Sequence, residues 1–587
     1  MSTRWVFPAF AAVMLGLPLL PVPDFWITQS ISIGLYSLVA LGLVLLTGVA
    51  GLTSFGQAAF VGIGGYAAAY LATQSGWPPL VSLAVGVLLA VAAALMLGAL
   101  TLRMSGHYLP LATIAWGLAL NYAMANMAWL GKYDGILGIP SMHLLGVDLG
   151  TGRGLHPLVW AIALFAALAV IRLLDSRPGR AIRALKHGST MAEAMGISTF
   201  RYKLTAFVLA AVLAAVSGWL FAHFQRSVSP SPFGINKGIE YLFMAVLGGV
   251  GHVWGAFLGS AAVRLMGDQL QVLLPQLLGS SGNFETIVFG IVLVVVLKYA
   301  PEGLWSFVGR WQPAAARKRD WGQAEALAKR VKPAAGEPLL QVDAVRKQFG
   351  GLVAVNDVSF GVNAGDIVAL IGPNGAGKST TFNLITGVLP LSAGAVRWRG
   401  QLIGGLPSRA IARLGISRTF QHVKMIPEMT VLENVALGAY GRSRSGILQA
   451  MLRLDRAEER RLFAEAELQL QRIGMADQMY ELAGNLALGQ QRLLEIARAL
   501  ATDPALLLLD EPAAGLRHNE KQALAAVLRQ LKAEGMSLLL VEHDMDFVMG
   551  LADHVVVMEF GTWLMSGTPA EVQASPAVRA AYLGTEH

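Results

Sequence analysis

Apolar runs fill most of the sequence from Trp5 to about Lys298, and they restrict the fold more than any other feature of the chain. Several runs reach the roughly 20 apolar residues that a helix needs to cross a bilayer, while others are short or interrupted by glycine. The sequence therefore predicts an all-α polytopic membrane domain with about eight to ten spans. The clearest runs are Trp5–Leu20, Ile27–Val49, Ala58–Leu71, Leu80–Leu102, Leu109–Leu130, Leu158–Leu173, Leu204–Phe224, Tyr241–Met266 and Thr286–Leu297.

The composition supports the same interpretation. Of the 587 residues, 55% are hydrophobic and only 14% are charged, whereas soluble domains carry about a quarter charged residues. The chain has no cysteine, which excludes disulfides, Cys-ligated zinc and iron–sulfur clusters. The net charge of +8 fits a membrane protein that keeps Lys and Arg on its cytoplasmic side, so we expect a lipid bilayer and no nucleic acid as partner.

Basic loops orient the predicted spans. Segment 175–203 contains Asp175 and Glu193 as its only acidic residues, and we expect it in the cytoplasm. Its basic residues are Arg177, Arg180, Arg183, Lys186, Arg201 and Lys203. A second basic cluster after the last run is also expected in the cytoplasm, which requires an odd number of spans in between. Three runs satisfy this, unless the glycines of segment 248–251 split one of them and make a piece re-entrant.

Both ends of the membrane domain can be placed approximately. We interpret the first run as a retained span, because no convincing small-residue cleavage site follows it. The membrane domain is expected at 1–311, followed by a Pro/Ala-rich cytoplasmic linker at 312–338 with room for a short helix. Residues 339–587 have the composition of a soluble α/β domain.

The stretch "IVALIGPNGAGKSTTFNLITG" predicts a buried strand, Ile367–Ile371, a glycine turn and a helix that begins near Lys378. This is the context of a P-loop, in which backbone N–H groups and a helix N-terminus bind phosphates. Lys378 is expected to reach the β and γ phosphates of ATP, and the Ser379 hydroxyl is expected to bind Mg²⁺. The predicted nucleotide contacts are Gly372, Asn374, Gly375, Gly377, Lys378, Ser379 and Thr380.

Two further apolar strands deliver polar residues to the same sheet edge. "ALLLLDEPAAGL" ends in Asp510, a second Mg²⁺ contact, and Glu511, which is placed to polarise the attacking water. "SLLLVEHDM" brings His543 to this edge. A lone histidine after a strand is usually structural, but next to the other two motifs we expect His543 to contact the γ-phosphate.

"GPNGAGKST", "RTFQHV", "LALGQQRLLEIARAL", "LLLLDEP" and "VEHDM", in this order, resemble the ATP-binding cassette (ABC) proteins. The resemblance implies a C-terminal α/β P-loop ATPase domain with antiparallel β and α-helical subdomains, in which Gln421 contacts Mg²⁺ or water and Phe349 stacks on adenine. It also implies that Leu486, Gly489 and Gln490 bind the ATP of a partner cassette. The sequence departs from the family pattern at Ala487, Leu488 and Arg517, where Ser, Gly and Asp are usual.

The remaining blocks resemble one branch of this family, the importers of branched-chain amino acids, with permease and ATPase fused. These blocks include "TGVAGLTSFGQAAFVGIGGYAAAYLA", "MAVLGGVGHVWGAFLG", "LKYAPEGLW" and the tail "GTPAEVQASPAVRAAYLG". "AEAMGIS" resembles the coupling segment that docks on the cassette near Gln421; its residues include Ala192, Glu193, Ala194 and Gly196. A plain amphipathic helix on the membrane surface is the alternative.

The glycines of segment 51–65 leave two interpretations open. Small residues at helical spacing favour close helix packing. Alternatively, Ser54 and Gln57 line the translocation path, because buried polar groups are costly in a membrane and usually functional.

The expected function is ATP-driven import of branched-chain amino acids or related small amphipathic solutes, by one half of a bacterial inner-membrane transporter. The expected partners are a second permease and ATPase, or a second copy of this chain, and an extracytoplasmic substrate-binding protein. An exporting half-transporter is the alternative, although its six long helices fit the many short runs poorly. A membrane-anchored ATPase without transport activity is a third hypothesis, and it needs only one span.

Overall fold

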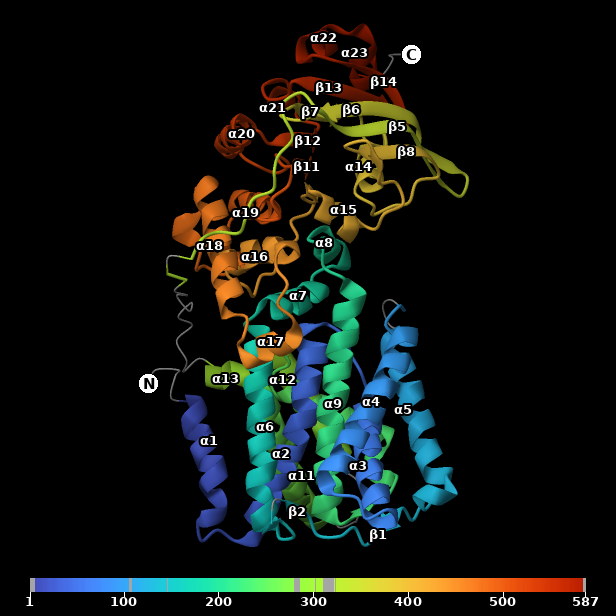
Figure 1. Ribbon diagram of the computed structural model, residues 1–587, viewed down its shortest axis with the longest axis vertical. Helices are drawn as coiled ribbons and strands as arrows, with labels where there is room; N and C mark the ends of the chain where they lie inside the picture. Colours follow the sequence, from blue (N-terminus) through green and yellow to red (C-terminus); the bar gives the residue numbers. More distant parts are fainter. Residues whose placement is uncertain are drawn as a thin grey trace. The chain divides into compact units, whose positions relative to one another are not determined.

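The computed structural model describes residues 6–104, 108–144, 146–278, 285–300, 302–309, 321–322 and 324–583. Two compact units divide the chain, and Figure 1 labels their elements. Unit 1 combines Met1–Asp175 with Phe200–Ala314, and unit 2 combines Ser176–Thr199 with Ala315–His587. The predicted cytoplasmic loop thus belongs to the same compact unit as the C-terminal domain.

In the part of unit 1 that the structure describes, helices are joined by loops that contain two short strand pairs. Strands β1 (Ile136–Leu137) and β4 (Ser227–Val228) pair antiparallel, as do β2 (His143–Leu144) and β3 (Val147–Asp148). The helices are α1 (Val6–Gly16), α2 (Asp24–Leu43), α3 (Gln57–Gln74), α4 (Pro79–Thr101), α5 (Tyr108–Asn126), α6 (Gly152–Leu174), α9 (Thr199–Gln225), α10 (Ile235–Gly248), α11 (Val253–Leu278), α12 (Glu285–Tyr299) and α13 (Trp305–Gly309).

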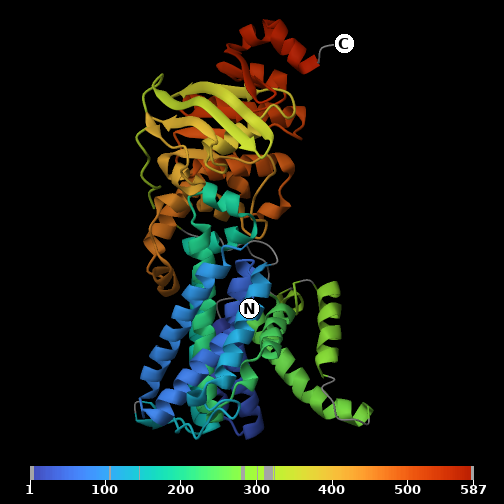
Figure 2. The ribbon, with the colours of Figure 1, turned by 90° about the vertical axis from the view of Figure 1, so that its right-hand side faces the viewer.

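Among the described residues, four helices are by themselves long and apolar enough to cross a membrane: Asp24–Val49, Pro79–Thr101, Gly152–Leu174 and Thr199–Gln225. The predicted run Tyr241–Met266 is split, because α10 and α11 meet at a bend of 119°. The pair forms a broken span or a re-entrant loop, as the glycine break suggested. Figure 2 shows α11 and α12 in green, extending to one side of the other helices. The number of eight to ten spans remains a prediction.

Glycines allow this bend and bring backbones close together. Gly249 has φ +116°, and a Cβ on Gly248 would lie 1.8 Å from the Gly255 carbonyl oxygen. Helix α3 shows the same close packing, since a Cβ on Gly64 would lie 2.0 Å from the Ala215 carbonyl oxygen. Only glycine fits at such approaches, so close packing accounts for Gly64 within segment 51–65.

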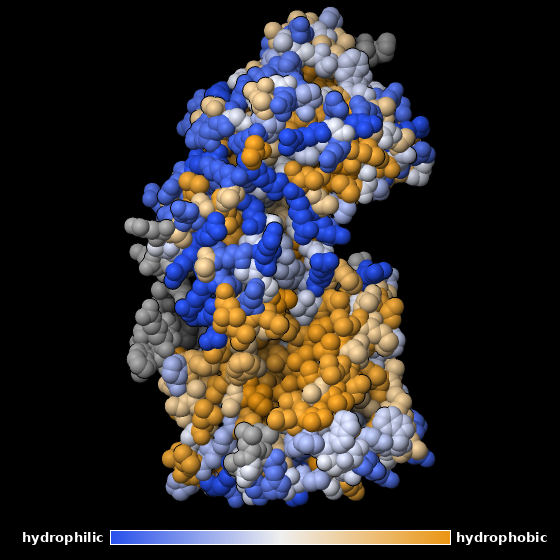
Figure 3. Space-filling view, viewed as in Figure 1, coloured by the Kyte–Doolittle hydropathy of each residue, from blue (hydrophilic) through white to orange (hydrophobic). Residues whose placement is uncertain are grey.

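The outer surface of unit 1 suits a hydrocarbon environment. Figure 3 shows a broad hydrophobic surface over these helices. Large apolar side chains on α4 and α6 are exposed, among them Leu88, Leu100 and Phe165. Exposed apolar patches of this extent are rare on soluble monomers, so the surface supports the prediction of a membrane domain.

Unit 2 contains a six-stranded sheet in the order β10–β11–β12–β7–β13–β14, parallel except for the last antiparallel pair. Its strands are β10 (Ile416–Arg418), β11 (Leu506–Asp510), β12 (Ser537–Val541), β7 (Ile367–Ile371), β13 (His554–Glu559) and β14 (Thr562–Gly567). A second sheet is antiparallel, with the order β6–β5–β8–β9. Its strands are β5 (Pro338–Phe349), β6 (Leu352–Asn363), β8 (Ala393–Trp398) and β9 (Gln401–Leu402).

The helices of unit 2 cover the parallel sheet and form a separate helical layer beside it (Figure 1). Those from the C-terminal part are α14 (Lys378–Ile385), α15 (Ser408–Leu414), α16 (Val431–Gly438), α17 (Ile447–Leu452), α18 (Arg456–Arg472), α19 (Leu488–Leu500), α20 (His518–Ala533), α21 (Met545–Met549), α22 (Pro569–Ala574) and α23 (Pro576–Leu583). The predicted loop adds α7 (Arg177–Lys186) and α8 (Ser189–Ala194).

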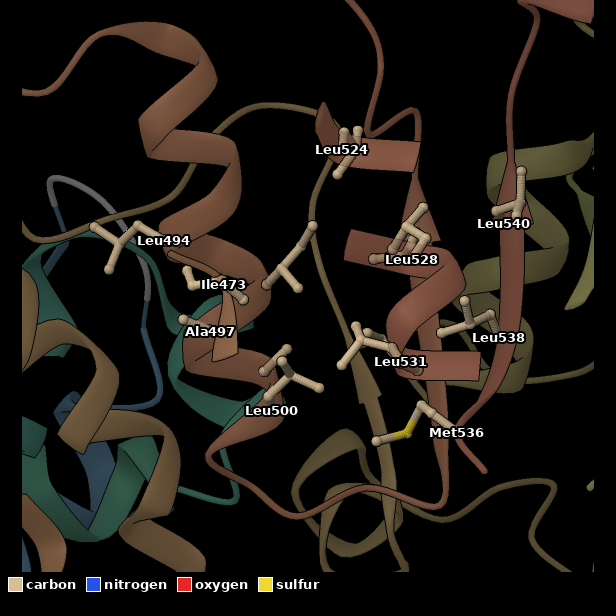
Figure 4. Packing of buried hydrophobic residues seen from close by; sticks show 14 of the residues in the cluster. Ile473, Leu494, Ala497, Leu500, Leu524, Leu528, Leu531, Met536, Leu538 and Leu540 are labelled. Carbon is tan, nitrogen blue, oxygen red and sulfur yellow. The ribbon is translucent and has the colours of Figure 1, made fainter. Parts of the chain in front are cut away.

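The core of unit 2 explains why its central strands read as continuous apolar runs. Every residue of β7, β11 and β12 is buried, as expected for parallel strands covered on both faces. Figure 4 shows Leu528 and Leu531 of α20 packed near Leu538 of β12, within one hydrophobic cluster that also includes Leu500 of α19. The elements that carry the polar motifs are therefore held by a common core.

The described part of the predicted linker, residues 321–322 and 324–338, belongs to unit 2. Residues 324–337 form no helix; their backbone is instead held by side chains of the cassette region. Leu327 joins the hydrophobic cluster, and its carbonyl accepts a hydrogen bond from Arg442 Nη2 at 3.1 Å. The Arg330 amide donates to Asp503 Oδ2. The predicted short helix has no counterpart in residues 324–337, and residues 312–320 and 323 of the predicted linker lie outside the described residues.

Candidate functional site

The glycine turn after β7 forms the expected phosphate cradle. Lys378 begins α14, and its Nζ donates to the carbonyl oxygens of Gly372 at 2.7 Å and Pro373 at 3.0 Å. Gly375 and Gly377 have φ values of +84° and +91°, which residues other than glycine rarely adopt. The lysine is thus folded over the turn, and burial lowers its pKa, although the carboxylates of Glu511 and Asp510 oppose that shift.

Asp510 ends β11 at the carboxyl edge of the sheet and is almost completely buried. Its Oδ2 lies 3.4 Å from Nη2 of Arg418, a cation that the sequence analysis did not assign. Its Oδ1 is buried and has no hydrogen-bond partner among the described residues. Burial raises the pKa of Asp510, and Arg418 opposes the rise. Arg418 ends β10, and only the pairing of β10 with β11 in the folded sheet places it beside Asp510.

Three predicted catalytic residues come together beside this carboxylate: Gln421, expected at Mg²⁺ or water, Glu511, expected at the attacking water, and His543, expected at the γ-phosphate. Gln421 Nε2 donates to Glu511 Oε2 at 3.2 Å, and His543 Nδ1 lies 4.0 Å from the same oxygen. The Glu511 backbone has φ +47°, an uncommon conformation outside glycine that is typical of strained functional turns. The side chain of His543 is 56% exposed, so it remains accessible to a ligand.

These features fit a nucleotide phosphate and a divalent cation. The turn leaves open space at Gly375, where a Cβ would meet no atom within 4 Å. No group of three His, Asp or Glu side chains in the described ranges could hold a metal alone. A bound Mg²⁺ would therefore take the Asp510 carboxylate, the Ser379 hydroxyl and Gln421 together with phosphate oxygens, which is the ligand type that Mg²⁺ prefers.

Glu542 is a functional neighbour that the sequence analysis missed. It is completely buried and accepts hydrogen bonds from the backbone amides of Ala513, at 2.6 Å, and His543, at 3.2 Å. Burial raises its pKa, and these two amides oppose the rise. Glu542 thereby fixes the positions of the turn after Glu511 and of the His543 backbone.

The "LALGQ" stretch lies at the start of α19. Ala487 is the N-cap residue and offers no side-chain cap, but the Gln490 side chain accepts a hydrogen bond from its amide at 3.0 Å. Gly489 and Gln490 are partly exposed, so both are available to a partner. Leu486 differs, because its side chain lies in the hydrophobic cluster, its amide donates to Ala483 and its carbonyl accepts from Gln491. We therefore assign Leu486 a structural position beneath the site.

Helix α19 also holds the loop that contains Gln421. Arg492 donates to the carbonyl oxygens of Phe420, at 2.8 Å, and Gln421, at 2.6 Å. Glu495 accepts the amide of Lys424 at 2.8 Å, and it is buried with Arg492 on the same helix. Burial raises the pKa of Glu495, although Arg498 and other donors oppose the rise. The charged side chains of α19 thus form a buried link between "LALGQ" and the Gln421 loop.

Phe349 ends β5, on the antiparallel sheet. Its side chain is exposed, and Lys347 Nζ lies 5.0 Å from the centre of its ring. The described contacts leave the ring available for stacking, so the adenine contact remains a prediction.

The predicted coupling segment packs on the C-terminal domain within unit 2. Ala192 and Ala194 of α8 are buried, and α8 lies against α15 (Figure 1). The Gly196 carbonyl accepts a hydrogen bond from Arg413 Nη2 at 3.4 Å. Glu193 accepts the Thr199 hydroxyl at 2.8 Å and so ties the end of α8 to the start of α9. Burial of this kind favours a docked segment over a helix lying on a membrane surface, and the coupling role of the segment remains a prediction.

Helix α7 makes stronger contacts that the sequence analysis missed. Arg180 is 2% exposed and donates to both carboxylate oxygens of Glu459 on α18, at 2.8 and 3.0 Å. The Arg177 amide donates to the same carboxylate at 2.6 Å, and its guanidinium lies 3.9 Å from the Tyr440 ring centre. The excess of arginine suggested a cytoplasmic loop, but only the fold shows which arginines are buried.

Comparisons with known families match both halves of the chain. The permease component of the branched-chain amino acid transport system matches residues 26–297, and the ABC transporter family matches residues 355–514. The family described as branched-chain amino acid ATP-binding cassette transporter matches residues 564–587. The permease and the ATPase therefore occur in one chain.

Individual relatives resemble the C-terminal domain. The high-affinity branched-chain amino acid transport ATP-binding protein LivG of Salmonella typhimurium is 43% identical over 251 residues, which are 42% of this chain and 98% of LivG. BraF of Pseudomonas aeruginosa, with the same description, is 42% identical over 42% of this chain and 98% of its own. A solved nucleotide-free cassette from an ABC transporter is 33% identical over 42% of this chain and 99% of its own, with a TM-score of 0.38.

The cradle after β7, the acidic edge at Asp510 and the match to nearly the full length of LivG agree with one another. The chain belongs to the ATP-binding cassette transporters, as a permease of the branched-chain amino acid type fused to a nucleotide-binding ATPase domain.

Proposed function

We propose that this chain imports branched-chain amino acids, or closely related small amphipathic solutes, across the cytoplasmic membrane of a bacterium at the expense of ATP. The carrying observation is the docking of α7 and α8, which lie in the permease sequence, on the cassette through the contacts Arg180–Glu459 and Gly196–Arg413. The matched families and the printed descriptions of LivG and BraF support the direction and the substrate class.

The cassette residues divide the hydrolysis among them. The amides of the glycine turn and Lys378 would hold the phosphates, and Ser379, Asp510 and Gln421 would hold Mg²⁺, which neutralises developing phosphate charge. Glu511 would orient the attacking water and accept its proton, and His543 would contact the γ-phosphate. The mutual contact of Gln421, Glu511 and His543 supports this division of roles.

A second cassette would complete the site. Gly489 and Gln490 at the start of α19 would contact the phosphates that a partner cassette holds, using free amides and the positive end of the helix dipole. Arg492 then connects this contact to the Gln421 loop, and Glu428, which follows that loop, lies 3.0 Å from His187 at the end of α7. We infer that the partner is a second permease and ATPase or a second copy of this chain, and that an extracytoplasmic binding protein delivers the solute.

Uptake into right-side-out membrane vesicles tests the proposal. The full chain, expressed with its partner subunits and binding protein, should accumulate radiolabelled leucine when ATP is generated inside the vesicles. Lys378→Ala should abolish uptake, because the phosphates lose their charged contact. Accumulation only in inside-out vesicles would indicate export instead, and equal uptake with Lys378→Ala would refute coupling to this cassette.

A further inference from the structure

Unit 1 contains a cavity of about 580 Å³ that none of the predicted site residues lines. Its walls come from α2, α9, the loop before α10, α10 and α12. Cavities of this size are typical of small-molecule sites. The aromatic part of the lining consists of Tyr36, Phe221, Phe233, Tyr241, Phe243 and Phe289.

One ion pair lies in this lining, which also contains the polar side chains of Ser231 and Asn236. Lys237 Nζ donates to both carboxylate oxygens of Glu240 at 2.8 Å, and both residues belong to α10. The Lys237 ammonium lies 4.4 Å from the ring centre of Tyr36, in the distance range of a cation–π contact. The ion pair and the aromatic side chains therefore line the same cavity, and Lys237 contacts one of those rings.

The ion pair Lys237–Glu240 lies deep in the membrane domain, where charged groups are energetically unfavourable. Tyr36 is halfway along the candidate span Asp24–Val49, so its neighbour Lys237 lies near the middle of the membrane domain. Ionisable residues at such depth are expensive, and those that persist usually face a cavity and serve a function. A pair one turn apart on a helix contributes only about 0.2–0.5 kcal/mol to its stability, so stability alone does not account for it.

The two charges remain accessible to a molecule in the cavity. The side chains of Lys237 and Glu240 are 21% and 31% exposed. The opposite face of α10 is packed, since a Cβ on Gly238 would lie 2.2 Å from the Phe55 carbonyl oxygen. Helix α10 thus uses one face for packing and presents its charges toward the cavity.

We propose that this cavity is a substrate site of the permease, in which Glu240 binds the α-ammonium and Lys237 the α-carboxylate of an amino acid while the aromatic wall contacts its branched side chain. This assignment rests on the proposed import function and names the charges that recognise the solute. A zwitterion carries both complementary charges on neighbouring atoms, whereas a solute with one charge would leave one partner unmatched.

Competition on the unmodified protein gives the first test. The full chain in lipid nanodiscs should bind radiolabelled leucine, and unlabelled leucine should displace it. 4-Methyl-2-oxopentanoate keeps only the carboxylate and 3-methylbutylamine keeps only the ammonium, so each should compete about tenfold more weakly or worse. Equal competition by either compound, or no leucine binding by a chain that imports leucine, would overturn the assignment.

Variants give the second test. Lys237→Gln/Glu240→Gln removes both charges at similar size and should weaken leucine binding and vesicle uptake about tenfold or more, with ATPase activity retained. The matched control is Arg264→Gln/Asp268→Asn, which removes another ion pair of unit 1, at 3.3 Å on α11, and should leave both readouts unchanged.

A charge exchange separates recognition from structure. Lys237→Glu/Glu240→Lys keeps an ion pair but exchanges the positions of its positive and negative charges. It should therefore bind leucine no better than the variant that lacks both charges. Full leucine binding by the charge-exchange variant would identify the pair as structural. A change confined to subunit association in native mass spectrometry would identify the pair as part of an interface. Both results overturn the proposal.

Uptake separates this assignment from the import function. If the unmodified chain imports no leucine, the import function fails. If the unmodified chain and Lys237→Gln/Glu240→Gln import leucine equally well, only this assignment fails.

Discussion

Removing the Glu459 carboxylate should uncouple ATP hydrolysis from transport. Glu459 binds both terminal nitrogens of Arg180, which is 2% exposed, and also the amide of Arg177. Phe463 lies 5.0 Å below the same guanidinium. Glu459→Ala therefore leaves the buried Arg180 guanidinium without its carboxylate partner and removes the hydrogen bond to the Arg177 amide at the start of α7.

The expected loss follows from the burial of the two partners. Removing one partner of a buried ion pair costs about 3–5 kcal/mol. The Glu459 side chain is 13% exposed, which admits water, so we expect the lower end of this range. A loss of about 3 kcal/mol weakens docking of α7 on the cassette about 10²-fold, since 1.4 kcal/mol corresponds to a factor of ten.

The assay is paired measurement of ATPase activity and leucine uptake in proteoliposomes with the partner subunits. ATPase activity should persist, while the number of leucine molecules transported per ATP falls at least about tenfold. Arg460→Ala, at an exposed position of the same helix, is the control and should behave like the unmodified protein. An unchanged ratio in Glu459→Ala would refute the reasoning.

Four further predictions concern other parts of the chain. Glu511→Gln should keep nucleotide binding but slow hydrolysis about 10²-fold or more, because the water loses its base; near-normal single-turnover rates would contradict this. Ala487→Ser supplies an N-cap hydroxyl to α19, and the ATP concentration for half-maximal activity should fall, as a titration would reveal. Gly248→Ala places a Cβ against backbone at the α10–α11 bend and should lower stability by about 1–3 kcal/mol in thermal unfolding, unlike Gly290→Ala, where space is open. Burial raises the pKa of Glu542 above its ordinary value of 4.5, so the folded state holds this proton more tightly than the unfolded state. The free energy of unfolding should therefore fall as pH rises from the pKa of the unfolded state to that of the folded state. Glu542→Gln should remove this pH dependence in urea titrations, and an unaltered dependence would reject the assignment.

Several features followed from local chemistry and could be predicted. The P-loop needs glycines at fixed spacing after a buried strand, and β7 and α14 begin and end where that pattern requires. Asp510 and Glu511 were expected at a strand end because parallel strands deliver their carboxyl ends to one edge, and the structure brings Glu511 within contact of Gln421 and His543.

Other features were not predictable because they depend on contacts between distant segments. Arg180 and Glu459 are 279 positions apart, and each alone reads as an ordinary surface charge. Arg418 beside Asp510 requires the order of strands in the sheet. Leu486 shares a motif with Gly489, yet it is buried while Gly489 is partly exposed.

The sequence by itself determined that one half of the chain suits a lipid bilayer and the other half suits water, and it determined the chemistry of the cassette. Apolar runs and the spacing of glycines and lysine in the P-loop are local patterns that can be read within a few residues. Only the tertiary structure decided which charges are buried against which partners, and that includes the pair Lys237–Glu240 inside its cavity. The physical reason is desolvation: the energy of a charge depends on what packs around it, and that environment is assembled from segments far apart along the chain.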